Sequence, residues 1–447
     1  MKTHFIASHV AAIVLLCALV PLAVQAAGKA SFLAPTRNVI PPLPGEPDFW
    51  SPPIASEAAA TPGATRGTAN APTILLPHQS PPDAPRASIS GARLPAEFEP
   101  HETLLLASAD LATTLPELLL DIVSSARGRI DIAVLVRGEH EKALIDELVS
   151  RRDLPRTAVR VLEVRHDTMW VRDYGPIFVS TEKGARLIVD GDYLQYGRPQ
   201  DDSVPMALAS AFRAAVVHAP AEIEGGNLLS NGRGLLVTTT ASVGSNEEHG
   251  LDEAELRDMY RRYLGATHVV FLEPLAREAT GHVDMFAAFT AADTVVVGQY
   301  RKSEDPENAA ILDRNAERLA GLPTSAGPLK VVRIPMPSNE GDVFRTYTNG
   351  IFANGVYLVP VYPSLDARLE RRALDVWRGQ LPDWKIVGVD ASVVIESGGA
   401  LHCLSMTVPA ATGVTPPRSP ERIEPPVSSE PPSTLAPRRF GRRLRSL

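Results

Sequence analysis

The sequence contains very little cysteine. Of its 447 residues only two are cysteines, Cys17 and Cys403. Cys17 lies in an N-terminal segment that we expect to be removed, so the mature chain would keep one thiol and could form no internal disulfide. An unpaired thiol in an exported chain is a candidate reactive group. The alternative is a buried cysteine that packs as a small apolar side chain.

The N-terminal apolar run is too short for a bilayer-spanning helix. It covers residues 10–24, which is 15 residues, whereas a spanning helix needs about 20. Small residues permit cleavage after Ala26, and Leu16 occupies the place where a lipid-attachment signal would have a small residue. We expect 1–26 to be a signal peptide and the protein to be exported, periplasmic or extracellular, without stable membrane insertion afterwards.

Proline is abundant but unevenly distributed. Thirteen of the 40 prolines lie within 35–85 and eight within 416–437. Both regions have few periodic apolar residues, so they cannot bury enough surface to offset the entropy of ordering. The sequence therefore predicts disordered extensions at 27–92 and 411–447, the second with a basic end.

Between these extensions, residues 93–410 form one predicted globular unit. It contains 32 Lys and Arg against 45 Asp and Glu, a net charge of −13. An acidic unit argues against nucleic acid as a partner and favours cationic substrates. At 318 residues it is large for a single core, but a closed repeating architecture can reach this size.

The unit lacks a glycine-rich phosphate loop after a strand, which argues against nucleotide binding. Short runs rich in Val, Ile and Leu predict strands at 103–107, 130–136, 159–164, 235–239, 294–300 and 330–334. Apolar residues at helical spacing predict helices at 115–126, 139–151, 205–216, 252–264, 307–319 and 366–378. This alternation predicts an α/β protein.

Four segments place polar side chains beside glycine or an aromatic ring. They are WVRDYGP at 170–176, EIEGGN at 222–227, GHVD at 281–284 and ESGGALHC at 396–403. In a strand-like segment His282 and Asp284 would point into one cavity, because side chains two apart share a face. His402 would point away from the adjacent Cys403, which makes it a poor candidate for the base. Each residue alone has a structural alternative, such as a turn cap, a core histidine or a salt bridge, but together they indicate catalysis.

These segments resemble the agmatine deiminases and the bacterial, Porphyromonas-type peptidylarginine deiminases, which are guanidino-group-modifying enzymes. The resemblance starts at LPAEFEPH, 94–101, includes YTNG at 347–350, and ends at Cys403. It implies a closed five-bladed ββαβ propeller of the pentein type around a central active site.

The resemblance also implies roles for individual residues. Asp173 and Asp284 would hold the terminal nitrogens of a guanidinium, Cys403 would attack its carbon, and His282 would transfer protons. Neither a metal nor a cofactor is needed. Further substrate-binding positions are Glu224, Trp170, Asn349, Arg198 and Gly399.

The substrate-selective loop differs from the family pattern. Arg198 matches the first of two arginines that bind a carboxylate in the peptidylarginine branch, but Gln200 replaces the second. Together with predicted export, Arg198 favours peptidyl or C-terminal arginine over agmatine, which stays the alternative. Arg198 could instead form a salt bridge with Asp201 or Asp202.

Other classes of protein compete with this interpretation. A cysteine protease would also use Cys403 and His282 but has no need of the acidic residues. A metal site at His282, Asp284 and Cys403 lacks the usual ligand spacing. An amidinotransferase would share the covalent step, and a catalytically silent surface-binding protein could keep the fold. A homo-oligomer is compatible with the sequence.

Overall fold

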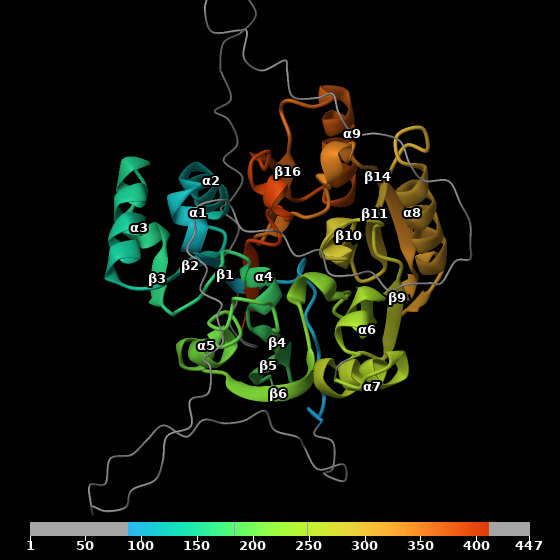
Figure 1. Ribbon diagram of the computed structural model, residues 1–447, viewed down its shortest axis with the longest axis horizontal. Coiled ribbons are helices and arrows are strands. Elements are labelled where there is room, and N and C mark those ends of the chain that lie inside the picture. The colour runs from blue at the N-terminus through green and yellow to red at the C-terminus, as the bar shows by residue number, and fades with distance from the viewer. Residues whose placement is uncertain (1–87, 183, 248, 411–447) are drawn as a thin grey trace, which may run out of the picture. The chain divides into compact units, whose positions relative to one another are not determined.

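The computed structural model describes residues 88–182, 184–247 and 249–410 (Figure 1). The predicted signal peptide, nearly all of the N-terminal extension and the C-terminal extension lie outside these residues. The chain divides into two units, 1–80 and 81–447, and every described residue belongs to the second. Within the described ranges no helix combines the length and the apolar character needed to cross a membrane.

The described residues repeat one order of elements five times. In each unit two strands pair antiparallel, and a helical connection then leads to a third strand that pairs parallel with the second. Parallel strands require such a crossover, so the alternation seen in the sequence is explained by this repeat.

The five units have the following elements. The first contains β18 (Ser405–Pro409), β1 (His101–Ala107), α1 (Ala109–Thr113), α2 (Pro116–Ala126) and β2 (Asp131–Val136), and it is extended by α3 (Glu139–Arg151) and β3 (Arg160–Glu163). The second contains β4 (Ile177–Ser180), β5 (Arg186–Asp192), α5 (Val204–Phe212) and β6 (Ala215–Glu222). The third contains β7 (Leu229–Ser230), β8 (Leu235–Thr239), α6 (Ala241–Ser245), α7 (Glu253–Leu264) and β9 (His268–Leu272). The fourth contains β10 (Ala287–Ala291), β11 (Thr294–Gln299), α8 (Pro306–Leu319) and β14 (Lys330–Pro335), with a small hairpin of β12 (Pro323–Thr324) and β13 (Gly327–Pro328). The fifth contains β15 (Ile351–Phe352), β16 (Val356–Val361), α9 (Ala367–Gln380) and β17 (Lys385–Asp390).

Short helical turns connect these units. They are η1 (Arg156–Ala158), α4 (Val171–Tyr174), η2 (Gly225–Asn227), η3 (Val283–Met285), η4 (Glu340–Asp342) and η5 (Val394–Ser397).

The helix of each unit packs against the unit before it in the chain, and the helix of the first unit packs against the fifth. Helix α2 contacts β16 and β17, α7 contacts β6, and α9 contacts β14. Helix α5 reaches the first unit, where the guanidinium of Arg160 lies 5.4 Å from the ring of Phe212. In α8, Asn315 accepts a hydrogen bond from the backbone of Glu273, just after β9. The first unit in turn joins the two ends of the described chain, because β18 pairs antiparallel with β1.

The amino-acid pattern accounts for these elements. Strand β11 reads Thr-Val-Val-Val-Gly-Gln, and the side chains of Val295, Val296 and Val297 are all buried, as expected for a strand covered on both faces. Helix α9 buries Leu369, Ala373 and Trp377 at a spacing of four residues, which is one face of a helix.

Two local predictions are corrected by the structure. The helix predicted at 205–216 ends at Phe212, because Arg213 takes a left-handed conformation with φ of 49° and β6 begins at Ala215. The segment with His282 and Asp284, predicted as strand-like, is the 3₁₀ turn η3.

Candidate active site

Four chain segments that are far apart in sequence meet beside strand β18. Asp173 lies in α4, and Glu224 directly precedes η2. His282 directly precedes η3, and Asp284 lies within it. Cys403 lies two residues before the start of β18. Direct contacts join α4 to η2 and to β18, and η2 to η3. The predicted catalytic side chains therefore lie on short turns between the units rather than on strands.

Gly226 lies where these side chains converge. A Cβ atom at this position would lie 2.6 Å from His282 Nδ1, 2.7 Å from Asp173 Oδ1 and 3.2 Å from Asp284 Oδ2. These distances leave no room for any side chain. The imidazole and both aspartates, which the sequence predicted as catalytic, thus surround one backbone position.

The thiol of Cys403 is buried beside Asp284. Its Sγ lies 3.8 Å from Asp284 Oδ2 and accepts a hydrogen bond of 3.3 Å from Asn349 Nδ2. Burial raises the pKa of the Cys403 thiol well above its ordinary value, and the charges of Asp284 and Asp173 raise it further. Without a bound cation, the sulfur is therefore a thiol rather than a thiolate at neutral pH.

Gly399 and Trp170, which the sequence predicted as substrate-binding positions, border the sulfur. A Cβ atom on Gly399 would lie 2.7 Å from Trp170 Cζ3 and 3.0 Å from Cys403 Sγ. Asn349, also predicted, accepts a hydrogen bond of 3.0 Å from the backbone nitrogen of His402. These three residues fix the position of the segment that carries the sulfur.

His282 is held between two carboxylates. Its Nε2 lies 2.5 Å from Glu224 Oε2 and its Nδ1 lies 3.6 Å from Asp173 Oδ1. Burial favours the neutral imidazole, but Asp173 and Glu224 outweigh it and raise the pKa of His282 to about 10. For Asp173, burial together with the charges of Glu224 and Asp284 raises the pKa to about 7, although His282 opposes this shift. The site thus holds a protonated imidazole at neutral pH.

Arg198 lies on the loop after β5, and the loop is tied to the site. Its Nη1 donates a hydrogen bond of 3.0 Å to the hydroxyl of Tyr193. Within the described part of the chain, no ion pair joins it to Asp201 or Asp202. Gln195 in the same loop donates to Glu224 Oε1 at 2.8 Å. The backbone and side chain of Gln200 both bind Asp167.

Sequence reasoning gave no role to three further residues of the site: Glu97 and Arg172 were not singled out, and His402 was considered only as a base and set aside. His402 Nδ1 lies 2.7 Å from Asp284 Oδ2, and its Nε2 lies 2.7 Å from Glu97 Oε2. Glu97, which is partly exposed, also forms an ion pair of 2.5 Å with the buried Arg172. The available signal was position, since Glu97 lies in the first resembling motif and Arg172 and His402 are adjacent to catalytic residues.

Two carboxylate oxygens in the site are buried without accepting a hydrogen bond from any described residue. They are Asp173 Oδ1 and Asp284 Oδ1. Buried polar atoms are normally satisfied, so this pair has hydrogen-bonding capacity left for a ligand. A planar cation with several N–H donors matches it. Among the described residues, no group of three or more His, Cys, Asp or Glu could hold a metal ion, and independence from metals and cofactors stays a prediction.

Comparisons with known proteins agree with this geometry. A sequence model of the Porphyromonas-type peptidyl-arginine deiminase family matches residues 93–409. A Streptomyces coelicolor protein with the name "Putative agmatine deiminase" is 28% identical over 339 residues, covering 71% of this chain and 98% of that protein. A Yersinia pestis protein with the same name is 26% identical over 285 residues, covering 57% and 78%.

Solved structures show the same fold. The structure of Enterococcus faecalis agmatine deiminase has a TM-score of 0.62 and 25% identity, covering 71% of this chain and 96% of that one. The described α/β fold therefore matches deiminase structures of the pentein type. The chain belongs to the Porphyromonas-type peptidyl-arginine deiminase family and is a guanidino-group deiminase, a hydrolase acting on amidine C–N bonds.

Proposed function

We propose that this protein hydrolyses the guanidino group of arginine, as the C-terminal residue of a peptide or within a peptide, to citrulline and ammonia. One observation carries the proposal. Two aspartates with unsatisfied carboxylate oxygens surround Gly226, beside a thiol and a protonated imidazole. This arrangement suits a flat cation whose central carbon is attacked by sulfur.

The covalent step uses Cys403. Burial and the aspartates raise the pKa of the Cys403 thiol. The bound guanidinium brings positive charge beside it, so substrate binding favours loss of the thiol proton to solvent, since His282 is already protonated. The thiolate then forms a C–S bond to the guanidinium carbon. His282 donates its proton to one terminal nitrogen, the C–N bond breaks, and ammonia leaves from a thiouronium intermediate.

The hydrolytic step regenerates the enzyme. His282, now neutral, takes a proton from a water that attacks the same carbon. The C–S bond breaks, the electron pair returns to sulfur, the remaining hydroxyl proton passes to the sulfur, and the neutral ureido product leaves, which restores the thiol and the protonated His282. Asp173 and Asp284 hold the reacting group in place through both steps, with their charges opposite its delocalised cation.

Arg198 supports an arginine substrate that retains a carboxylate. Arg198 supplies the positive charge of the loop after β5, and Gln195 in the same loop donates a hydrogen bond to Glu224. An α-carboxylate is the group by which arginine differs from agmatine. Agmatine is the second candidate. It is supported by the agmatine deiminase relatives and by Gln200, which leaves the loop with one arginine instead of two.

Two wider features belong to the same proposal. The helix of each unit contacts the preceding unit, and β18 closes the first sheet, which supports a closed five-bladed propeller with the site at its centre. The N-terminal run at 10–24 supports export with cleavage after Ala26, which N-terminal sequencing of the secreted protein tests.

The deciding experiment compares four substrates. Protein is incubated with agmatine, free arginine, a peptide ending in arginine and a peptide with internal arginine, without any added amine, while ureido product and ammonia are measured. We expect turnover of arginine peptides and no turnover by the Cys403→Ser variant. Turnover of agmatine alone would replace the proposed substrate. Activity that needs an added amine would indicate an amidinotransferase.

A further inference from the structure

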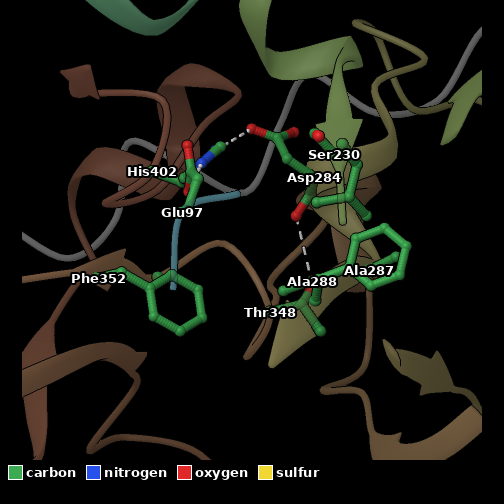
Figure 2. Close-up of a pocket in the computed structure, with 11 residues that line it drawn as sticks. Glu97, Ser230, Asp284, Ala287, Ala288, Thr348, Phe352 and His402 are labelled. Carbon is green, nitrogen blue, oxygen red and sulfur yellow. Dashed lines mark hydrogen bonds and ion pairs between the residues drawn. The ribbon is translucent and has the colours of Figure 1, made fainter. Parts of the chain in front are cut away.

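His402 lies between the carboxylates of Asp284 and Glu97. Its ring nitrogens are 2.7 Å from Asp284 Oδ2 and 2.7 Å from Glu97 Oε2. Figure 2 shows the Asp284 carboxylate directed at the His402 ring, with Glu97 beside the ring. Burial and Arg172 oppose protonation of the ring, but Glu97 and Asp284 outweigh them and raise the pKa of His402. A carboxylate at each nitrogen thus favours the protonated ring, which donates on both sides.

This contact divides the two oxygens of Asp284 between different partners. Oδ2 meets the His402 ring and the sulfur of Cys403, whereas Oδ1 accepts no hydrogen bond from the described residues. The backbone of the same residue is also held, since Thr348 Oγ1 donates to its carbonyl oxygen at 3.4 Å. His402 thus fixes the rotation of the carboxylate and leaves one oxygen for substrate.

His402 is itself fixed from the opposite side. Arg172 pairs with Glu97 at 2.5 Å and donates from Nε to the carbonyl oxygen of His402 at 3.4 Å. The backbone nitrogen of His402 donates to Asn349. Because Arg172 and His402 are both less than 10% exposed, this network has little freedom to reorganise.

We propose that His402 is a positioning residue for the deiminase reaction, which orients the Asp284 carboxylate between the sulfur of Cys403 and the substrate guanidinium. The inference rests on the proposed function. His402 acts on the reaction through Asp284, and the Glu97–Arg172 pair anchors the His402 ring.

A matched pair of substitutions separates the two contacts of the ring. In His402→Asn the amide nitrogen stands as many bonds from Cα as Nδ1, so a donor toward Asp284 is kept and that toward Glu97 is lost. In His402→Gln the amide nitrogen corresponds to Nε2, so the donor toward Glu97 is kept instead. Both variants remove the positive charge. We expect kcat/KM to be about 10- to 100-fold lower in the Gln variant than in the Asn variant.

Alkylation of Cys403 by iodoacetamide gives a readout that needs no turnover. An Asp284 carboxylate released from His402 opposes thiolate formation more strongly, so His402→Gln should be alkylated more slowly than His402→Asn. In an Asp284→Asn background the two variants should react alike, as a double-mutant cycle requires of residues that act through one contact. Wild-type turnover is measured first, so that failure of the proposed function is seen separately from failure of this inference.

Three outcomes would overturn the inference. The first is equal kcat/KM in the Asn and Gln variants at equal thermal stability. The second is a difference in alkylation that persists in the Asp284→Asn background. The third applies if the Gln variant does not fold. A loss of kcat/KM beyond 10-fold in the Asn variant, which keeps the donor toward Asp284, would then contradict a role that depends on the Asp284 contact.

Discussion

At the scale of single residues, we expect Asp284 to have opposite effects on the resting thiol and on the reaction. Its carboxylate lies 3.8 Å from the sulfur and contributes to the raised pKa of Cys403. Asp284→Asn should therefore lower the thiol pKa and speed alkylation by iodoacetamide at pH 8, while kcat/KM falls by on the order of 100-fold because a guanidinium contact is lost. Slower alkylation in a folded Asp284→Asn variant would contradict this electrostatic account.

Arg198 is the residue on which the proposed choice of substrate depends. Arg198→Gln should raise KM for a peptide ending in arginine about 10-fold with little change in kcat, because the lost contact is the same in ground and transition states. KM for agmatine, which has no carboxylate, should not rise. Arg165→Gln, an exposed arginine before α4, is the control. An equal rise in KM for both substrates would show that Arg198 does not meet the carboxylate.

At the scale of elements, the sequence predicts which segments meet but not the conformation that brings them together. His282 and Asp284 do share a site, although alternation along a strand was the wrong reason, since His282 precedes a 3₁₀ turn and Asp284 lies within it. The turns η2 and η3 are too short to show any periodicity, so only the family motifs locate them. Glu97, Arg172 and His402 were given no role in the site because their network is formed by tertiary contacts, and its only trace in the sequence is that these residues lie in or beside the motifs.

The turn η2 provides a prediction about backbone approach. Gly226→Ala would place a methyl group within 2.6 to 3.2 Å of His282, Asp173 and Asp284, and displacement of a catalytic group by about 1 Å can cost about 100-fold in rate. We expect a loss of kcat/KM on the order of 100-fold. Gly244→Ala in α6, where a Cβ meets nothing within 4 Å, is the matched control and should keep wild-type activity. Activity of Gly226→Ala within threefold of wild type would contradict the arrangement.

At the scale of the whole molecule, the sequence predicts alternation but not the order of the sheets. The predicted strands at 235–239 and 294–300 match β8 and β11 closely, because buried parallel strands are continuous apolar runs. Strands such as β6, which includes exposed residues, give a weaker signal. Pairing of β18 with β1 joins Met406, near the end of the described residues, to Leu105, near their beginning. Local residue patterns contain no information about such long-range pairing.

The buried charges of the site should make the stability of the whole molecule depend on pH. The folded pKa of His282, about 10, lies above its ordinary value of 6.5, so its stabilising charge is fully present below pH 6.5 and is lost as pH rises through 10. The raised pKa of Asp173, about 7, acts in the same direction at lower pH, since the folded state holds its proton more tightly. Tm should therefore fall between pH 7 and 9.

The contribution of His282 can be isolated by comparing slopes. Tm is measured by circular dichroism from pH 7 to 9, a range below the ordinary pKa of tyrosine, in a Cys403→Ser background that removes titration of the thiol. Introducing His282→Asn should lower Tm at pH 7, where the two carboxylates lose their cation, and should flatten its decline with pH. If Tm falls with pH at the same slope in both proteins, His282 is not held protonated by Glu224 and Asp173. The imidazole would then enter the reaction as a base rather than as the acid that releases ammonia.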